Sequence, residues 1–346
     1  MNESSTVFDR KDIRVVDVEE PQIERDNQVK IAVKYAGICG SDLHEYLGGP
    51  IFIPADAPHP HSGVQAPLTM GHEFSGEIVE VGSAVDSVKV GDPVTVEPIL
   101  AKDGLKGDYN LDPNLGFVGL ASHGGFTEFC VVDEDQVHIL PEGIDFEQGA
   151  LTEPAAVALY SVRQSAIKAG DTAAVFGAGP IGLLTIEALK AAGATEIYAV
   201  ELSKERQEKA EHLGAIVVDP NEGDPVAKIK ELAGGSLDVS FEVTGVPAVL
   251  QQSLDVVKSG GECVVVSIWE GGAEFQPNEL VIREKTMKGI IAYRHIFPQV
   301  LKLMKQGYFK KEDYVTSHIK VEEIVEKGFE ALANERSQIK IMVQPK

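Results

Sequence analysis

The stretch 172–193, TAAVFGAGPIGLLTIEALKAAG, decides the fold of this chain. A short apolar run leads into Gly177-Ala178-Gly179-Pro180-Ile181-Gly182, which fits G-x-G-x-x-G between a strand and a helix. The first glycine permits a tight turn, the second lets the backbone approach a pyrophosphate, and the third lets helix and strand pack closely. Free N–H groups at the start of the helix attract phosphate. The stretch therefore predicts a dinucleotide-binding strand–turn–helix unit.

An acidic residue supports this prediction. Glu201 stands 19 residues after Gly182, at the end of the next apolar run. A carboxylate there accepts hydrogen bonds from ribose hydroxyls and repels a 2′-phosphate, which favours NAD over NADP. Lys204 and Arg206 leave NADP open, because either cation could contact a 2′-phosphate.

Six short apolar runs alternate with helical segments from about residue 171. The first helical segment ends at Gly193, and the second starts after Ser203 and ends at Gly214. Strands buried on both faces and joined by helices form a parallel sheet. We therefore predict an α/β fold with a doubly wound parallel sheet of the Rossmann type. The six runs are TAAVFGAG, EIYAVEL, AIVVDP, LDVSFEVTG, ECVVVSI and TMKGIIAY.

The first 150 residues have a different texture. Four segments alternate apolar and polar residues between turn residues, as half-buried strands do; they are 29–37, 75–82, 92–98 and 124–132. Segments 48–69 and 98–123 are predicted to be loops. We assign 1–155 and 296–346 to a mostly-β domain that ends in the strand-like IKIMVQP, and 156–295 to the nucleotide-binding domain.

Composition excludes several classes of partner. The chain of 346 residues has 31 Lys+Arg and 54 Asp+Glu, a formal net charge of −23. So acidic a surface repels nucleic acid and anionic membranes, and no apolar run is long enough to span a bilayer. Three widely spaced cysteines are not a disulfide framework. We expect a cytoplasmic protein, with Cys130 and Cys263 in the core.

Four residues in the first domain form a candidate zinc set. Cys39 lies between glycine-containing turns, His72 and Glu73 are adjacent, and Glu153 stands at a predicted helix start. Thiolate, imidazole and carboxylate are zinc ligands, and three of them leave one position open for catalysis. Each residue also has an ordinary interpretation: a lone cysteine as a small buried hydrophobe, and Glu153 as a helix-start charge.

These segments resemble the zinc-dependent medium-chain alcohol dehydrogenases. GHEFSGEIVEVGSAV (71–85) matches that family's zinc signature, and GICGSDLHEY and GAGPIGLL match its other landmarks in the expected order. Stretches such as GSDLHEYLGGPIFIP and LTEPAAVALYSVR look most like the bacterial (R,R)-2,3-butanediol dehydrogenases, also called acetoin or diacetyl reductases. The resemblance spans nearly the whole chain. It implies a GroES-like catalytic domain beside the Rossmann domain, and oxidation of a small secondary alcohol or vicinal diol with NAD.

The resemblance also implies roles for single residues. Cys39, His72 and Glu153 look like the ligands of a catalytic zinc, and Glu73 like a carboxylate that coordinates directly or approaches the metal. Ser41 stands where a hydroxyl contacts the substrate oxygen, and His44 where a histidine relays the proton to solvent. The implied NAD contacts are Gly177, Gly179, Pro180, Ile181, Gly182, Glu201, Arg206, Val243, Thr244, Gly245, Ser267 and Ile268.

Two departures from that family lead to further expectations. Many members hold a structural zinc with four clustered cysteines, but residues 98–120 contain none. We therefore expect one zinc per chain. The N-terminus lacks the usual apolar start of a first strand, so we expect the first dozen residues to be loosely ordered. Lys340, in the last strand, is expected to contact a phosphate or ribose.

Several alternatives remain open at this point. The substrate could be a polyol of the sorbitol type or threonine, although the apolar segment 51–53 suits methyl groups. A nucleotide-binding protein with an inactive metal site, or a zinc-free enone reductase, would lack ligands that are present here. His59 and His61 could bind a second metal, but we expect solvated loop residues without an acidic partner. We expect a homodimer or homotetramer.

Overall fold

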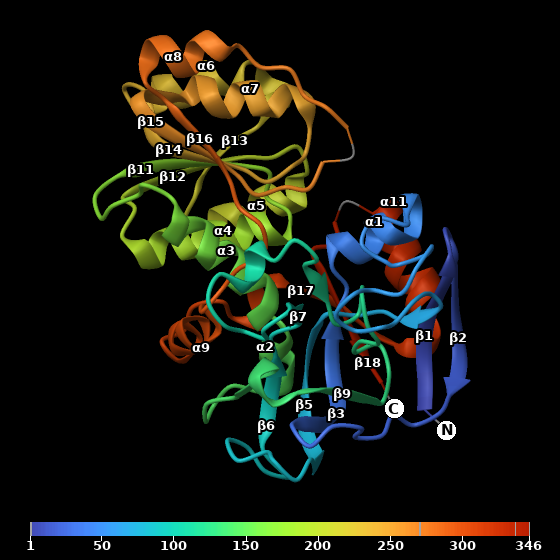
Figure 1. Cartoon of the computed structure of the whole chain (residues 1–346). Coiled ribbons are helices and arrows are strands. Elements are labelled where there is room, and N and C mark those ends of the chain that lie inside the picture. The colour runs from blue at the N-terminus through green and yellow to red at the C-terminus, as the bar shows by residue number, and fades with distance from the viewer. Residues whose placement is uncertain (1, 270, 336, 346) are drawn as a thin grey trace. The chain divides into compact units, whose positions relative to one another are not determined.

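The computed structural model describes residues 2–269, 271–335 and 337–345. The chain forms two compact units (Figure 1). Unit 1 comprises Met1–Glu153 and Phe297–Lys346, and unit 2 comprises Pro154–Ile296. Each unit has its own sheet, and the two are described separately below.

Unit 2 is built on a six-stranded sheet with the order β13-β12-β11-β14-β15-β16. Every neighbouring pair is parallel, which confirms the predicted doubly wound α/β fold. The strands are β11 (Thr172–Phe176), β12 (Glu196–Val200), β13 (Ile216–Val218), β14 (Leu237–Glu242), β15 (Val257–Val265) and β16 (Thr286–Gly289).

Helices connect these strands. Gly193 ends α4 in the left-handed conformation, with φ 89°, and α5 begins directly after Ser203, as the sequence predicts. The helices of this unit are α3 (Thr152–Gln164, whose first two residues belong to unit 1), α4 (Pro180–Ala192), α5 (Lys204–His212), α6 (Pro225–Leu232), α7 (Pro247–Val256) and α8 (Pro277–Arg283).

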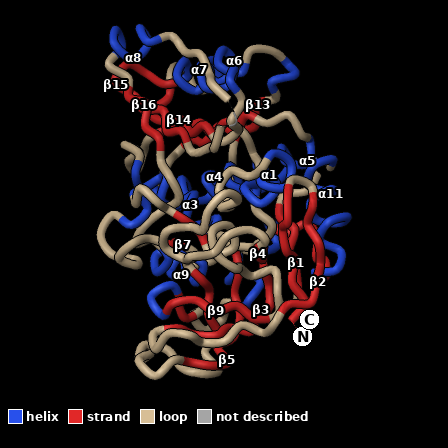
Figure 2. The backbone as a smooth tube through the Cα atoms, turned by 45° about the vertical axis from the view of Figure 1, so that its right-hand side comes forward, coloured by secondary structure: helices blue, strands red, loops and turns tan. Residues whose placement is uncertain are grey.

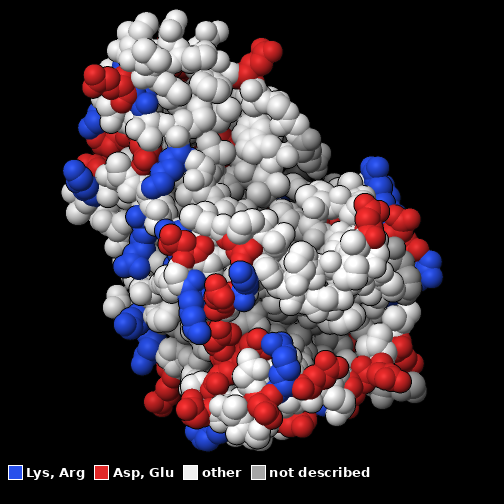
Figure 3. Space-filling model, viewed as in Figure 1, with Lys and Arg blue, Asp and Glu red and all other residues white. Residues whose placement is uncertain are grey.

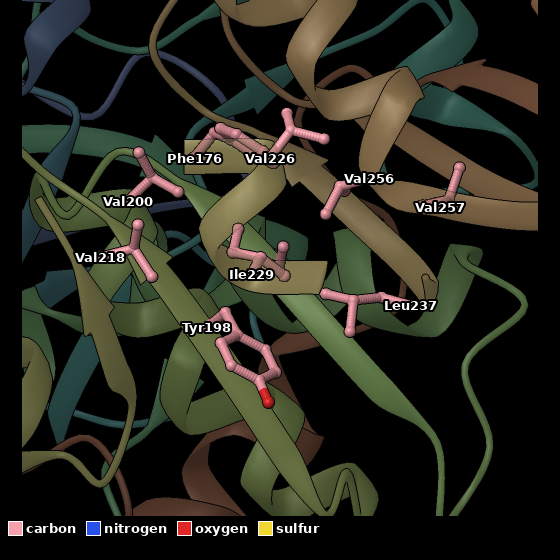
Figure 4. Packing of buried hydrophobic residues seen from close by; sticks show 10 residues of the cluster. Phe176, Tyr198, Val200, Val218, Val226, Ile229, Leu237, Val256 and Val257 are labelled. Carbon is pink, nitrogen blue, oxygen red and sulfur yellow. The ribbon is translucent and has the colours of Figure 1, made fainter. Parts of the chain in front are cut away.

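One hydrophobic cluster fills the space between the sheet and a covering helix. Phe176 and Tyr198 from the central strands lie against Val226 and Ile229 of α6 (Figure 4). Their side chains are almost completely buried, and burial of such apolar side chains is the main stabilising contribution to a sheet packed against helices. Cys263 is fully buried in β15, as predicted.

Unit 1 is mostly β-structure. Its largest sheet has the order β10-β6-β5-β3-β18-β17, with β9 also paired to β3. The strands of this sheet are β3 (Gln28–Gly37), β5 (Glu73–Val81), β6 (Pro93–Val96), β9 (Phe129–Asp133), β10 (Val137–Ile139), β17 (Val315–Lys320) and β18 (Lys340–Gln344). The helices are α1 (Gly40–Gly48), α2 (Phe146–Ala150), α9 (Phe297–Lys305), α10 (Lys311–Tyr314) and α11 (Glu330–Asn334).

The expectation of a loosely ordered N-terminus is wrong. β1 (Asn2–Asp9) pairs with β2 (Asp12–Val18) and with β4 (Leu68–Thr69) in a small separate sheet (Figure 2). The strand buries polar residues, and among them Ser4 Oγ lies 2.5 Å from Thr69 Oγ1. The missing apolar pattern therefore reflects a polar buried strand and not an absence of structure.

The segment 98–123 is largely irregular, as expected, and its short strands β7 (Ile99–Leu100) and β8 (Gly116–Phe117) pair with each other. Asp112 links parts of this segment, because it accepts hydrogen bonds from the backbone N–H groups of Lys102 at 2.9 Å and Asn114 at 2.7 Å. His61 Nε2 lies 3.1 Å from the same carboxylate. The expectation that His61 has no acidic partner is wrong, because Asp112 reaches it from 51 residues away in sequence.

Acidic and basic side chains interleave on the face shown in Figure 3, and the acidic ones gather over the lower part of unit 1. This pattern agrees with the acidic composition. Among the helices of the described residues, none has the combination of length and apolar character that crossing a bilayer requires.

Candidate active site

Three of the predicted metal ligands converge in unit 1. One donor atom from each of Cys39, His72 and Glu73 lies within 4.8 Å of the others. Cys39 directly precedes α1, and His72 and Glu73 lie where the chain enters β5. His72 is 4% exposed and Glu73 is fully buried. A thiol, an imidazole and a carboxylate are thus held together, and the last two lie away from solvent.

Asp42 positions two of these residues, and sequence reasoning missed it. Its carboxylate accepts the backbone N–H of Cys39 at 3.0 Å, and its other oxygen lies 3.4 Å from His72 Nδ1. Asp42 is fully buried on α1. A carboxylate behind a histidine fixes the ring orientation, as it commonly does for metal-bound imidazoles. The signal in the sequence was its place three residues after Cys39, as in a helix cap.

The surroundings of His72 are strongly negative. Burial alone would lower its pKa, but the Asp42 carboxylate and the Cys39 sulfur outweigh burial and raise the pKa of His72 well above its ordinary value. The Ser41 hydroxyl lies 3.2 Å from His72 Nε2. A site with these charges attracts a cation.

Lys340 contacts the metal-binding group, and its expected contact with a phosphate or ribose stays a prediction. Its ammonium group is buried and lies 2.8 and 2.6 Å from the two carboxylate oxygens of Glu73, and 3.0 Å from the carbonyl oxygen of Ile38. Burial would lower the pKa of Lys340, but the neighbouring Glu73 raises it above its ordinary value. The last strand brings this cation to the metal-binding group because β18 pairs with β3.

Glu153 is not part of the three-residue group found among the described residues. It is buried at the start of α3, and its charge also acts on Lys340. Its role as a metal ligand stays a prediction, and so does the choice between Glu73 and Glu153 as the resting ligand.

Ser41 and His44 lie on the same helix, α1. Residues three positions apart face the same side of a helix. Ser41 contacts His72, while His44 is half-buried, one turn further along. Two polar side chains therefore lie on one side of α1, and the relay role expected for them stays a prediction.

The glycine loop of unit 2 has the predicted geometry. Gly177 has φ 102°, a value that favours glycine. At Gly182, a Cβ atom would lie 1.9 Å from the carbonyl oxygen of Gly177, so only glycine fits between the loop and α4. Gly179 precedes the first turn of α4, and Pro180 is its first residue. The helix therefore offers free N–H groups at this end.

Glu201 organises the mouth of that loop. One carboxylate oxygen accepts the N–H of Ala178 at 2.8 Å, and the other accepts those of Leu202 at 2.8 Å and Ser203 at 2.9 Å. The acidic residue thus ties the glycine loop to the start of α5. Arg206 lies beside the loop as well, with a guanidinium nitrogen 3.8 Å from where a Gly179 Cβ would be.

The Lys204 side chain binds two residues outside the glycine loop. Its ammonium group lies 3.0 Å from Asp219 and 3.1 Å from the Gln207 side chain. The pKa of Asp219 is lowered to about 2, by its hydrogen bond from the Asn221 backbone first and by Lys204 as well. A 2′-phosphate at this position would have to compete with Asp219 for Lys204.

The remaining predicted nucleotide residues lie on two neighbouring loops. Glu242, at the end of β14, is fully buried and accepts hydrogen bonds from the N–H groups of Thr244 at 2.7 Å and Gly245 at 3.0 Å, and from the Ser267 hydroxyl. A Cβ at Gly245 would lie 3.0 Å from the Ile268 carbonyl oxygen. Sequence reasoning missed Glu242; its only signal was an acidic residue at the end of an apolar strand.

Comparison with known proteins identifies the family of this chain. Residues 25–142 match the alcohol dehydrogenase GroES-like domain, and residues 180–306 match the zinc-binding dehydrogenase domain. The chain is 62% identical over 338 residues to (R,R)-butanediol dehydrogenase of Bacillus subtilis, with 97% of both chains covered. This chain belongs to the zinc-type medium-chain alcohol dehydrogenases. The family resemblance seen in the sequence is thereby confirmed.

A second relative and a solved structure agree with this assignment to the alcohol dehydrogenases. The (R,R)-butanediol dehydrogenase of Neisseria gonorrhoeae is 41% identical, with 98% of both chains covered. The crystal structure of the B. subtilis 2R,3R-butanediol dehydrogenase aligns with this chain over 100% of both proteins, with a TM-score of 0.97 and 60% identity. The GroES-like and Rossmann architecture expected for a medium-chain alcohol dehydrogenase is therefore correct.

Proposed function

We propose that this chain is a zinc- and NAD-dependent dehydrogenase that interconverts (R,R)-2,3-butanediol and acetoin and also reduces diacetyl. The observation that carries the proposal is the buried group of Cys39, His72 and Glu73, in a chain 62% identical to a protein of that name. Unit 1 would then be the catalytic domain and unit 2 the nucleotide-binding domain.

A zinc ion fits the residues present. Thiolate, imidazole and carboxylate are its usual ligands, and one donor atom from each of Cys39, His72 and Glu73 lies within 4.8 Å of the others. Cys39, His72 and either Glu73 or Glu153 would hold the ion, with no cysteine cluster for a second one. When bound, zinc supplies a Lewis acid that stabilises negative charge on the substrate oxygen.

The chain's own residues handle the proton. Oxidation of the alcohol to a ketone passes two electrons to the nucleotide and releases one proton. Ser41, beside His72, would accept a hydrogen bond from the substrate hydroxyl and pass the proton on, and half-buried His44 would release it to solvent. Histidine suits this role because its unperturbed pKa, about 6.5, lies near neutrality.

Glu201 supports NAD as the nucleotide. Its hydrogen bonds to backbone N–H groups fix it at the mouth of the glycine loop, where its charge opposes a 2′-phosphate. Glu242 holds the two loops that carry Thr244 and Ser267. The proposed nucleotide contacts on these loops therefore depend on one buried carboxylate.

Aromatic side chains beside His72 favour a small, partly apolar substrate. The Phe117 ring centroid lies 6.4 Å from that of His72, and the Phe52 ring lies 6.1 Å from that of Phe117. A long polyol needs hydrogen-bonding partners along its whole length. The methyl groups of 2,3-butanediol suit this wall better than the hydroxyls of sorbitol do.

Self-association through unit 2 is part of the proposal. β16 is an edge strand of the six-stranded sheet, and Val281 and Ile282 of the preceding helix are 74% and 75% exposed. An open edge and exposed apolar residues favour a two-fold interface, and thus a homodimer or a tetramer made of dimers. The free cysteines fit a reducing compartment such as the cytoplasm.

One assay tests the activity directly. Purified enzyme is mixed with acetoin, (R,R)- and (S,S)-butanediol, sorbitol and threonine, and NADH absorbance is followed with and without a zinc chelator. We expect chelator-sensitive turnover of acetoin and the (R,R)-diol, and one zinc per chain by metal analysis. Faster turnover of sorbitol or threonine would replace the proposed substrate. Turnover that survives complete zinc removal would contradict the metal's role.

A further inference from the structure

A buried carboxylate on α1 binds the segment that carries Phe52. Glu45 is 2% exposed, and its carboxylate accepts the backbone N–H of Ile51 at 3.1 and 3.0 Å, that of Ile53 at 3.2 Å, and that of Phe52. Its carbonyl oxygen also accepts the Gly49 N–H at 3.0 Å. Hydrogen bonds to a charged acceptor are stronger than neutral ones, so Glu45 holds this segment firmly on α1.

The close fit of the turn supports this interpretation. A Cβ at Gly49 would lie 2.5 Å from both the carbonyl oxygen and a carboxylate oxygen of Glu45. The segment is therefore pressed against the helix, and Ile53 is 7% exposed. Among the ion pairs of the described residues, none involves the buried Glu45 carboxylate. The consecutive backbone N–H donors of 51–53 satisfy its charge instead.

A continuous path of side chains links Glu45 to the metal-binding group. Glu45 fixes the Phe52 backbone, the Phe52 ring packs edge-on against Phe117, and the Phe117 ring lies beside His72. Phe117 is 9% exposed and comes from the short strand β8. The two rings therefore form one wall next to a metal ligand, and the position of that wall depends on the 51–53 backbone.

We propose that Glu45 is a positioning residue for substrate selection. By fixing the backbone of 51–53 it places Phe52 against Phe117, and this wall limits the carbon substituent that fits beside His72 to about the size of a methyl group. The inference rests on the proposed diol dehydrogenase function and extends it to a named determinant of substrate size. Loosening the wall would admit longer substituents and weaken the binding of short ones.

The test compares two diols in three variants. The diols are 2,3-butanediol and 3,4-hexanediol, which adds one methylene on each side. In Glu45→Gln an amide N–H₂ group would face the backbone N–H donors. We therefore expect a higher KM for butanediol and a kcat within about threefold of the wild-type value. One methylene in an apolar pocket changes selectivity by about 10-fold or more. We therefore expect the kcat/KM ratio of butanediol to hexanediol to fall by about that factor, and likewise in Phe52→Ala.

Tyr46→Phe is the matched control. Tyr46 is the next residue on α1, and the variant loses one partly buried hydrogen bond, from the Tyr46 hydroxyl to Glu330 at 2.6 Å. We expect its diol ratio to equal that of the wild type. Hydrogen–deuterium exchange gives a readout independent of activity: the amides of 51–53 should exchange faster in Glu45→Gln and at the wild-type rate in Tyr46→Phe.

The outcomes separate the two proposals. Faster exchange in Glu45→Gln with an unchanged diol ratio overturns the role in selection, and unchanged exchange overturns the positioning role itself. A fall in kcat with an unchanged ratio would assign Glu45 to the stability of α1 instead. A wild-type enzyme that oxidises neither diol contradicts the proposed function, while the exchange measurement still tests whether Glu45 holds the segment.

Discussion

The Lys340 ammonium group contacts both carboxylate oxygens of Glu73, at 2.8 and 2.6 Å, across 267 residues of sequence. Both side chains are buried, and Glu73 is at the same time one of three candidate metal donors. The charge of Glu73 is therefore balanced by a protein cation. This pair links the last strand of the chain to the candidate metal centre.

Replacing the cation should leave a costly buried charge. We expect Lys340→Met to lower the free energy of unfolding by about 3 to 5 kcal/mol, because Glu73 then has no partner. The double variant Lys340→Met, Glu73→Gln should recover most of this loss, since the charge is gone. Urea unfolding of both variants checks the prediction. A single variant within about 1 kcal/mol of the wild type would argue against it.

Removing the charge of Glu201 should change nucleotide preference. We expect Glu201→Gln to weaken NAD binding by about 10-fold, because charged hydrogen-bond acceptors are worth more than neutral ones. NADP binding should weaken less, since the repulsion of its 2′-phosphate is relieved. Calorimetric titration of both nucleotides measures the ratio. Glu205→Gln is the control and should leave the ratio unchanged; Glu205 lies on the following helix, α5, and accepts a hydrogen bond from the Ser203 hydroxyl.

The relay assigned to His44 predicts a specific pH dependence. His44→Ala should slow alcohol oxidation by about 10-fold, and most at low pH, where solvent offers few other proton acceptors. Imidazole added to the assay should partly restore the rate. The measurement is the dependence of kcat on pH for the variant and the wild type. Identical pH profiles for the two proteins would remove His44 from the proposed relay.

Asp112 should contribute to stability in a defined pH range. Hydrogen bonds from the Lys102 backbone and from His61 lower the pKa of Asp112 from 3.8 to about 2. A depressed acid pKa stabilises the folded chain above the ordinary value, and this contribution disappears as pH falls through about 2. We expect Asp112→Asn to cost about 1 to 2 kcal/mol at pH 7.

That difference should narrow as the pH falls below 4. The measurement is the free energy of unfolding by urea of Asp112→Asn and of the wild type at pH 7, 5 and 3.5. A difference between the two proteins that stays constant over this range would mean that the carboxylate charge contributes nothing to holding the 98–123 segment together.

The sequence predicted those features that depend on local rules. The glycine loop, the parallel sheet of unit 2 and the glycine that ends α4 follow from spacing and backbone conformation, which neighbouring residues set. The donors Cys39, His72 and Glu73 could likewise be named in advance, because the thiol, imidazole and carboxylate stand in recognisable short motifs.

Pairings across long sequence distances could not be predicted in this way. The polar strand β1, the bond between His61 and Asp112, and the hold of Glu242 on two loops all depend on partners that the fold brings together. A polar residue carries no sign in the sequence of whether it will be buried and satisfied or solvated.

The sequence by itself determined the fold, the nucleotide loop and the chemistry of the metal donors, since these depend on residue type and short-range spacing. Only the tertiary structure decided how the charges are balanced: Lys340 pairs with Glu73, Asp42 orients His72, and Glu45 fixes the segment of Phe52. The reason is physical. A buried charge must find a partner wherever the chain places one, and that place is set by the packing of strands and helices distant in sequence.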